Sequence, residues 1–140
     1  MAWFAIALVL LGNVVYHLGL RAIPREANPA VATLAAYLVA TVATAATLPL
    51  LARGVPFGPA WRTLNWSTVV VGVAIVGIEM GYLLAYRAGW TLSTASVTAN
   101  VSLAVVLLGI GTVAFREPWS PSRAVGVGFC MIGLWLVNRG

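Results

Sequence analysis

The chain has 140 residues, of which 61% are hydrophobic and only 8% are charged. Ordinary globular domains carry about 25% charged residues, so this composition excludes a soluble globular domain. The net charge of +5 comes from arginines that are spread singly along the chain. Nucleic-acid binding, which uses basic side chains clustered on one solvated face, is therefore not expected.

The apolar residues occur in long runs, which predict membrane-spanning helices because backbone groups find no water in hydrocarbon. We expect an all-α integral membrane protein, with one transmembrane domain over residues 1–140. Asn28 before Pro29, and Ser120 before Pro121, are typical of helix starts. The five predicted spans cover about residues 2–20, 29–52, 66–86, 91–115 and 121–137.

The tryptophans support this division of the chain. All six lie at or near a predicted span end, as expected for interfacial belts of indole rings. They are Trp3, Trp61, Trp66, Trp90, Trp119 and Trp135. We expect a multi-pass protein of the plasma membrane, the inner membrane in a bacterium, whose first partner is the lipid bilayer.

The arginines are balanced across the membrane. One side receives Arg53, Arg62, Arg116 and Arg123, and the other receives Arg21, Arg25, Arg87 and Arg139. The positive-inside rule then favours neither orientation, which predicts dual topology unless the balance is accidental. Two copies inserted in opposite senses would form an antiparallel homodimer of ten helices, an inverted repeat suited to alternating access.

The third span contains a carboxylate near its middle, in the stretch VAIVGIEMGYLLAY. At about 100° per residue, Glu79, Tyr82 and Tyr86 share one helix face, and Gly77 and Gly81 lie on the opposite face. The glycine face suits close packing against another helix. We interpret Glu79 as a proton- or cation-binding group that lines a transport path. The alternative is a protonated structural glutamate bonded to a neighbouring helix.

Two other spans carry polar candidates. Asn13, Tyr16 and His17 lie on about one third of the circumference of the first span. His17 is a candidate for a proton relay, although a packing role is equally compatible with its position. Asn100 in the fourth span needs a polar partner if it is buried. These residues complete the set predicted to bind substrate or protons.

Motifs for other chemistry are missing from the sequence. It contains no HExxH motif, no Cys/His metal cluster and no GxxxxGK[ST] phosphate loop. Its three acidic residues give no paired carboxylate site and no Ser-His-Asp set within one chain. We therefore expect no enzyme activity, no cofactor and no metal.

The stretch from Tyr86 to Asn138, with a short turn, a span rich in small residues and a loop containing Glu117, resembles the second half of an EamA-type repeat of the drug/metabolite transporter superfamily. The segment GNVVYH resembles the first span of that repeat, with His17 where a lysine is frequent. Gly126, Gly128 and Gly133 match the helix-packing glycines of the last span. Most members have ten spans in two inverted repeats, so this chain resembles one repeat. It is more distantly similar to the small multidrug resistance family, whose glutamate lies in the first of four spans.

The resemblance implies a secondary transporter. We expect an exporter or antiporter of small metabolites, organic cations or amino acids, in which Glu79 couples substrate to protons. The first alternative is a non-transporting membrane subunit or scaffold that needs a different partner chain. A channel is a weaker alternative.

Overall fold

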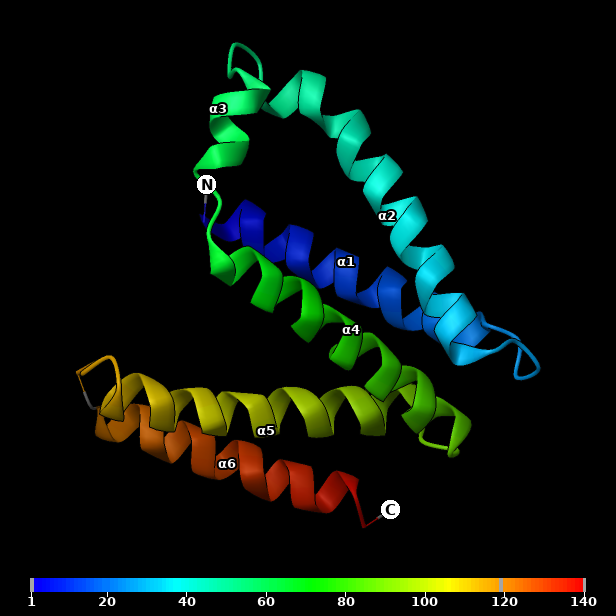
Figure 1. Cartoon of the computed structure of the whole chain (residues 1–140). Helices are drawn as coiled ribbons and strands as arrows, with labels where there is room; N and C mark the ends of the chain where they lie inside the picture. The colour runs from blue at the N-terminus through cyan, green and yellow to red at the C-terminus, as the bar shows by residue number, and fades with distance from the viewer. Residues whose placement is uncertain (1, 119, 140) are drawn as a thin grey trace. The chain divides into compact units, whose positions relative to one another are not determined.

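The computed structural model describes residues 2–118 and 120–139, and every regular element within these ranges is a helix. The expected all-α class is confirmed (Figure 1). The elements are α1 (Ala2–Ala22), α2 (Pro29–Leu51), α3 (Phe57–Arg62), α4 (Trp66–Arg87), α5 (Leu92–Val113) and α6 (Pro121–Val137).

Four of these helices, α1, α2, α4 and α5, are long and apolar enough to cross a membrane. α6 has 17 residues and lies at the short end of the range of about 17–25 that spanning helices use. The fifth span therefore stays a prediction. α3 lies in the connection from α2 to α4, between the second and third predicted spans, and its rings of Phe57 and Trp61 lie 5.7 Å apart.

The helix starts follow the capping signals in the sequence. The Asn28 side chain accepts hydrogen bonds from the backbone N–H groups of Ala30 and Val31, at 2.9 and 3.4 Å, and Pro29 follows as predicted. Ser120 occupies the N-cap of α6, but its hydroxyl contacts the Ser122 hydroxyl at 2.6 Å in place of a backbone N–H. Gly89, with φ of 96°, makes the turn after α4 possible because side chains disfavour this conformation.

The chain divides into two compact units. The N-terminal unit, Met1–Ala88, contains α1 to α4, and α4 packs against both α1 and α2. α2 approaches α1 and α4 where the loop of residues 23–28 lies, and it diverges from them toward α3 (Figure 1). The buried side chains of this unit are therefore concentrated near that loop. They are Leu20, Thr33, Glu79, Leu83 and Tyr86.

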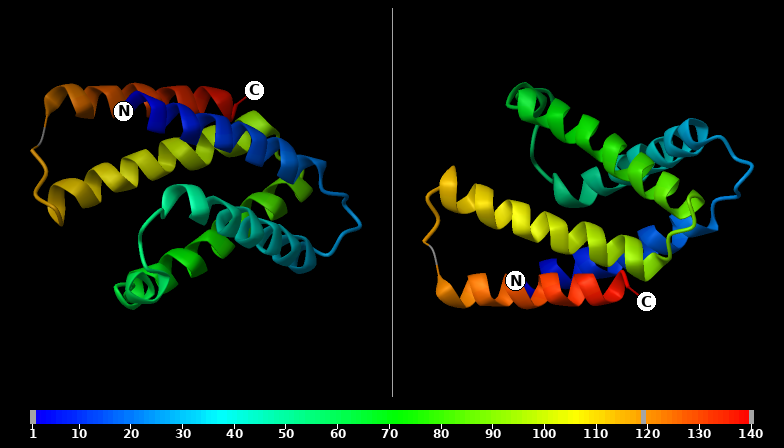
Figure 2. Two further views of the ribbon diagram at one scale, coloured as in Figure 1. Left: turned by 90° about the horizontal axis from the view of Figure 1, so that it is seen from above. Right: turned by 90° about the horizontal axis from the view of Figure 1, so that it is seen from below.

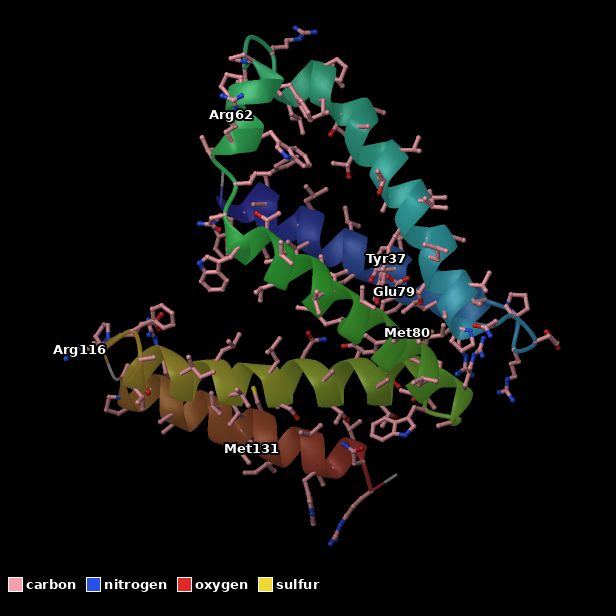
Figure 3. The ribbon with its side chains drawn as sticks, viewed as in Figure 1. Tyr37, Arg62, Glu79, Met80, Arg116 and Met131 are labelled. Carbon is pink, nitrogen blue, oxygen red and sulfur yellow. The ribbon has the colours of Figure 1, made fainter. Side chains whose placement is uncertain are left out.

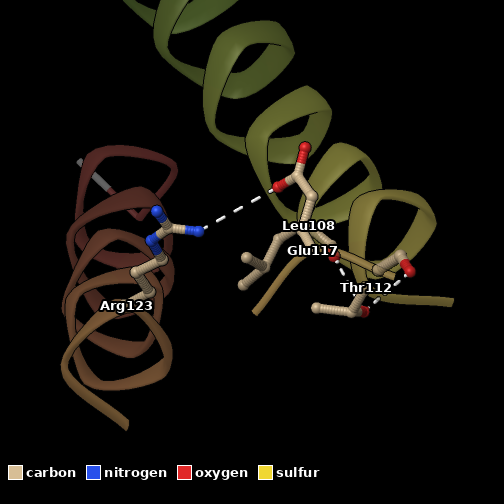
Figure 4. Close-up of polar contacts among 5 residues, drawn as sticks. Leu108, Thr112, Glu117 and Arg123 are labelled. Atoms are coloured by element: carbon tan, nitrogen blue, oxygen red, sulfur yellow. Dashed lines mark hydrogen bonds and ion pairs between the residues drawn. The ribbon is translucent and has the colours of Figure 1, made fainter. Parts of the chain in front are cut away.

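The C-terminal unit, Gly89–Gly140, is a pair of helices, α5 and α6, that lie side by side (Figure 2). The Asn138 amide donates to the Thr98 hydroxyl at 3.1 Å and joins the two helices at one end. At the other end, the Glu117 backbone N–H donates to the Gly111 carbonyl at 3.0 Å, which finishes α5. The Glu117 carboxylate lies 4.0 Å from Arg123, and both side chains are 56% exposed (Figure 4). Such an exposed pair adds little stability.

Most large apolar side chains point outward in both units, as a hydrocarbon solvent allows. Trp3, Trp61, Trp66 and Trp135 are among these exposed side chains and lie near helix ends. Trp90 is also exposed and precedes α5, whereas Trp119 lies outside the described residues. The described tryptophans thus occupy positions that suit a membrane interface.

The glycines predicted to pack against other helices have open surroundings. A Cβ built on Gly77, Gly81, Gly126, Gly128 or Gly133 meets nothing within 4 Å. In contrast, a Cβ on Gly111 would lie 3.0 Å from Oε2 of Glu117. The packing of Gly77, Gly81, Gly126, Gly128 and Gly133 against another helix stays a prediction.

Candidate functional site

Glu79 is almost completely buried, with 6% of its surface exposed. It lies eight residues before the end of α4, which is about 12 Å along the helix axis. Its helix face is the one that α1 and α2 cover, because Leu83 and Tyr86 on the same face are also buried. The structure therefore places the carboxylate inside the N-terminal unit and well away from the helix end.

A tyrosine of α2 lies beside the Glu79 carboxylate. Tyr37 faces Glu79 across the contact between α2 and α4 (Figure 3), and the two groups interact electrostatically. The Tyr37 hydroxyl is buried and makes no well-directed hydrogen bond within the described residues. One turn earlier, buried Thr33 donates from its hydroxyl to the sulfur of Met80 at 3.3 Å. α2 thus presents two polar side chains to α4.

Tyr37 and Thr33 were not among the residues predicted from the sequence. Their signal is the spacing of four residues, which puts both on one face of a span otherwise rich in alanine and threonine. Because threonines recur through the whole of α2, this face could not be distinguished without knowing where α4 packs.

α1 contributes an aromatic cluster. Nδ1 of His17 lies 2.9 Å from the Tyr86 hydroxyl. The rings of His17 and Tyr82 meet edge to face with 4.6 Å between centroids, and the rings of Tyr16 and Tyr82 do so at 6.3 Å. Tyr16 also lies within electrostatic range of Glu79. One polar contact and several aromatic contacts therefore join α1 to α4.

We call this group the Glu79 cluster: Glu79, Tyr16, His17, Tyr37, Tyr82 and Tyr86. The structure brings together five of the seven residues predicted to bind substrate or protons, all within the N-terminal unit. Asn13 lies on α1 but is exposed. Asn100 belongs to the C-terminal unit, where its amide donates to the Ser96 carbonyl at 2.8 Å. This amide N–H group is therefore bonded within its own helix.

The cluster combines one carboxylate with several phenol rings. A carboxylate binds a proton or an organic cation, and the faces of tyrosine rings attract cations when water is excluded. Within the described residues, no group of three or more His, Cys, Asp and Glu side chains could hold a metal ion. The chemistry available here is reversible binding of a proton or an ammonium group.

A second feature adjoins the cluster at the end of α4. A pocket of about 260 Å³ is lined by Arg21 of α1, Arg25 of the following loop and Arg87 of α4. The lining is completed by Leu20, Ile23, Leu83 and Tyr86. Leu83 and Tyr86 belong to the same face of α4 as Glu79. The pocket therefore shares two lining residues with the face of α4 that carries Glu79.

Comparison with known proteins finds a similar curated protein of Proteus mirabilis (strain HI4320), the probable 4-amino-4-deoxy-L-arabinose-phosphoundecaprenol flippase subunit ArnF. The two are 30% identical over 90 residues, a match that covers 56% of this chain and 66% of the relative. The chain thus spans slightly less than two thirds of that relative's length. No protein-family model matches, and no solved structure matches significantly.

The similarity and the apolar helices agree on a coarse description. The chain is a multi-pass helical membrane protein, and it is similar to a protein named for moving a lipid-linked sugar across a membrane. The resemblance to one EamA-type repeat is finer than this and stays a prediction.

Proposed function

We propose that the chain is the membrane-embedded subunit of a secondary active transporter, in which Glu79 alternately binds a proton and the positively charged group of a substrate. The observation that carries this proposal is the burial of the Glu79 carboxylate among tyrosines from three apolar helices. An ionisable group inside a membrane helix is costly, and such groups mark ion or substrate pathways.

Competition for one carboxylate supplies the coupling. A protonated Glu79 is neutral and attracts no cation, whereas an ionised Glu79 needs a positive partner in an apolar environment. Substrate binding would therefore release the proton, and proton binding would release the substrate. Tyr82 and Tyr86 would offer ring faces to the bound cation, and His17 would relay protons at the α1 side.

Alternating access requires a second half. An antiparallel homodimer would supply it, because the inverted copy gives a ten-helix assembly with two Glu79 carboxylates. The balanced arginines support this arrangement. The exposed glycine face of α4, opposite the Glu79 face, is available for the contact between copies.

Substrates of this transporter would carry an amino group or another organic cation. The class includes small metabolites, organic cations and amino acids. The named cargo of the relative contains an amino sugar, which adds the amino-bearing headgroup of a lipid to this class. We propose the shared positive charge, and not one compound, as the feature that the Glu79 cluster recognises.

The test is transport by the purified full-length protein in liposomes. A pH gradient should drive uptake of tetraphenylphosphonium, a basic amino acid or an amino sugar, and Glu79→Gln should abolish uptake of whichever probe moves. Glu117→Gln is the matched control, because Glu117 is an exposed acid of the C-terminal unit. Normal transport by Glu79→Gln would show that the proposed coupling is wrong.

A second candidate is a non-transporting subunit that needs a different partner chain. The description of the relative as a flippase subunit favours it. In that case Glu79 would fix the assembly, and the purified chain alone would transport none of the probes. Co-expression with candidate partner chains should then restore transport, whereas the antiparallel homodimer needs no addition.

A further inference from the structure

We propose that the pocket formed by Arg21, Arg25 and Arg87 binds the phosphate group of an anionic ligand at the membrane surface. This inference does not rest on a transport role for Glu79. The ligand class is a phosphate monoester or diester, presented either by a lipid headgroup or by a free phosphate compound.

The pocket is built by the fold and is not a chance gathering of surface charges. α1 and α4 both end at it, and Arg21 and Arg87 each lie in the last turn of their helix. Arg25 comes from the loop that connects α1 to α2. Three guanidinium groups that are separated in the sequence are therefore brought to one cavity of about 260 Å³.

Arg87 is held in place. Its Nη2 atom donates to the Ala27 carbonyl, which ties the end of α4 to the loop before α2. Its Nε–H group is buried and makes no hydrogen bond within the described residues. Because Arg87 also lines the pocket, a guanidinium already fixed by one hydrogen bond is positioned to donate to an oxyanion there.

The electrostatic balance favours an anion. The C-terminal ends of two helices contribute roughly half a negative charge each, which opposes anion binding. Three arginines outweigh these two ends, and the pocket lining contains no acidic side chain. Glu26 is next to Arg25 in the sequence but is exposed and does not line the pocket. The electrostatic potential in the cavity is therefore positive.

The size and position of the pocket indicate a headgroup-sized ligand. Its volume is below the range of about 300–1,000 Å³ that is typical of pockets for drug-sized molecules. Leu83 and Tyr86 also line it, and both belong to the face of α4 that carries Glu79. Arginines that merely face lipid headgroups would require no such cavity.

The experiment uses the full-length protein in dodecyl maltoside, a detergent without phosphate, at fixed ionic strength. Isothermal titration with dioctanoyl phosphatidic acid should show binding, and dioctanoylglycerol, which lacks only the phosphate, should not bind. Arg25→Gln should weaken phosphatidic acid binding about tenfold, the effect of losing one charge-assisted hydrogen bond. Arg87→Gln should weaken it further, but this change also removes the contact with Ala27.

Arg53→Gln and Arg62→Gln are the matched controls, because both arginines belong to the N-terminal unit and neither lines the pocket. They should leave binding unchanged. Competition by inorganic phosphate would identify a site for free phosphate, and binding of phosphatidic acid without such competition would identify a headgroup site. The proposal is overturned if neither phosphatidic acid nor inorganic phosphate binds. It is also overturned if Arg25→Gln binds phosphatidic acid normally, or if the control variants weaken binding as much as Arg25→Gln does. Glu79→Gln should retain phosphatidic acid binding, which separates this test from that of transport.

Discussion

The hydroxyl of Tyr86 and Nδ1 of His17 lie 2.9 Å apart and form a polar link between α4 and α1. Tyr86 is 4% exposed, so water does not compete for this bond. Around it, the rings of Tyr82 and Tyr86 stack at 6.1 Å, and the ring of His17 is edge-on to both. The link therefore combines one hydrogen bond with a set of aromatic contacts.

A double-mutant cycle should measure this hydrogen bond. Tyr86→Phe and His17→Ala should show a coupling energy of about 0.6 kcal/mol and not more than about 1.7 kcal/mol, the range found for polar contacts between membrane helices. The measurement is reversible unfolding in mixed micelles. Tyr82→Phe is the control, because Tyr82 meets His17 through its ring and keeps that contact as phenylalanine. Equal coupling for both tyrosines would contradict a specific role for the Tyr86 hydroxyl.

Tyr37→Phe should separate stability from function. Its hydroxyl is buried without a well-directed hydrogen bond, so removing it should leave the free energy of unfolding unchanged or raise it by up to about 1 kcal/mol. Proton-coupled transport should fall, because the hydroxyl faces Glu79. The measurements are micellar unfolding and liposome uptake on the same preparation. A loss of stability of about 2 kcal/mol or more would instead indicate a strong hydrogen bond to the carboxylate.

Leu83 and Leu84 offer a matched pair on α4. Leu83 is 2% exposed and Leu84 is 52% exposed. Leu83→Ala should lower the free energy of unfolding by about 2 kcal/mol, the low end for buried leucines, because lipid replaces water as the outer solvent and only packing is lost. Leu84→Ala should change it by less than about 0.5 kcal/mol. Equal effects would show that α4 packs through a different face.

The orientation of the chain should respond to the loss of two arginines from one side. C-terminal reporter fusions of the natural chain should be active on both sides of the membrane, because its arginines are balanced. Arg53→Gln combined with Arg62→Gln should leave activity on one side only, since the connection containing α3 then loses its positive charge. Activity on one side for the natural chain would rule out the antiparallel homodimer.

Much of the helical arrangement could be predicted from the sequence, because apolar length and capping residues act locally. The expected span of residues 29–52 corresponds to α2 within one residue, and Asn28 caps it as predicted. α3 was not predicted, because a helix of six residues that contains glycine and proline has no periodic apolar signal in the sequence. The number of membrane crossings also stays open, because α6 is of borderline length.

The candidate site was predictable on α4 and only partly on its neighbours. Helical spacing alone put Glu79, Tyr82 and Tyr86 on one face. The contribution of Tyr37 depended on how α2 crosses α4, which is a tertiary property. The pocket of Arg21, Arg25 and Arg87 was missed for a similar reason. Single arginines at span ends have an ordinary explanation in lipid headgroups, and only the fold shows that three of them share a cavity.

The two faces of α4 differ, so contacts between copies can be altered without altering the buried Glu79 face. The Glu79 face is covered by α1 and α2, whereas a Cβ added at Gly77 or Gly81 would meet nothing within 4 Å. A bulky residue at Gly77 should therefore be tolerated by an isolated copy and be felt only by a partner that packs there. Such a variant would hold the protein as single copies with an intact carboxylate. With this variant, an unmodified second copy and a different partner chain can each be added, and the transport activity that each restores can be compared.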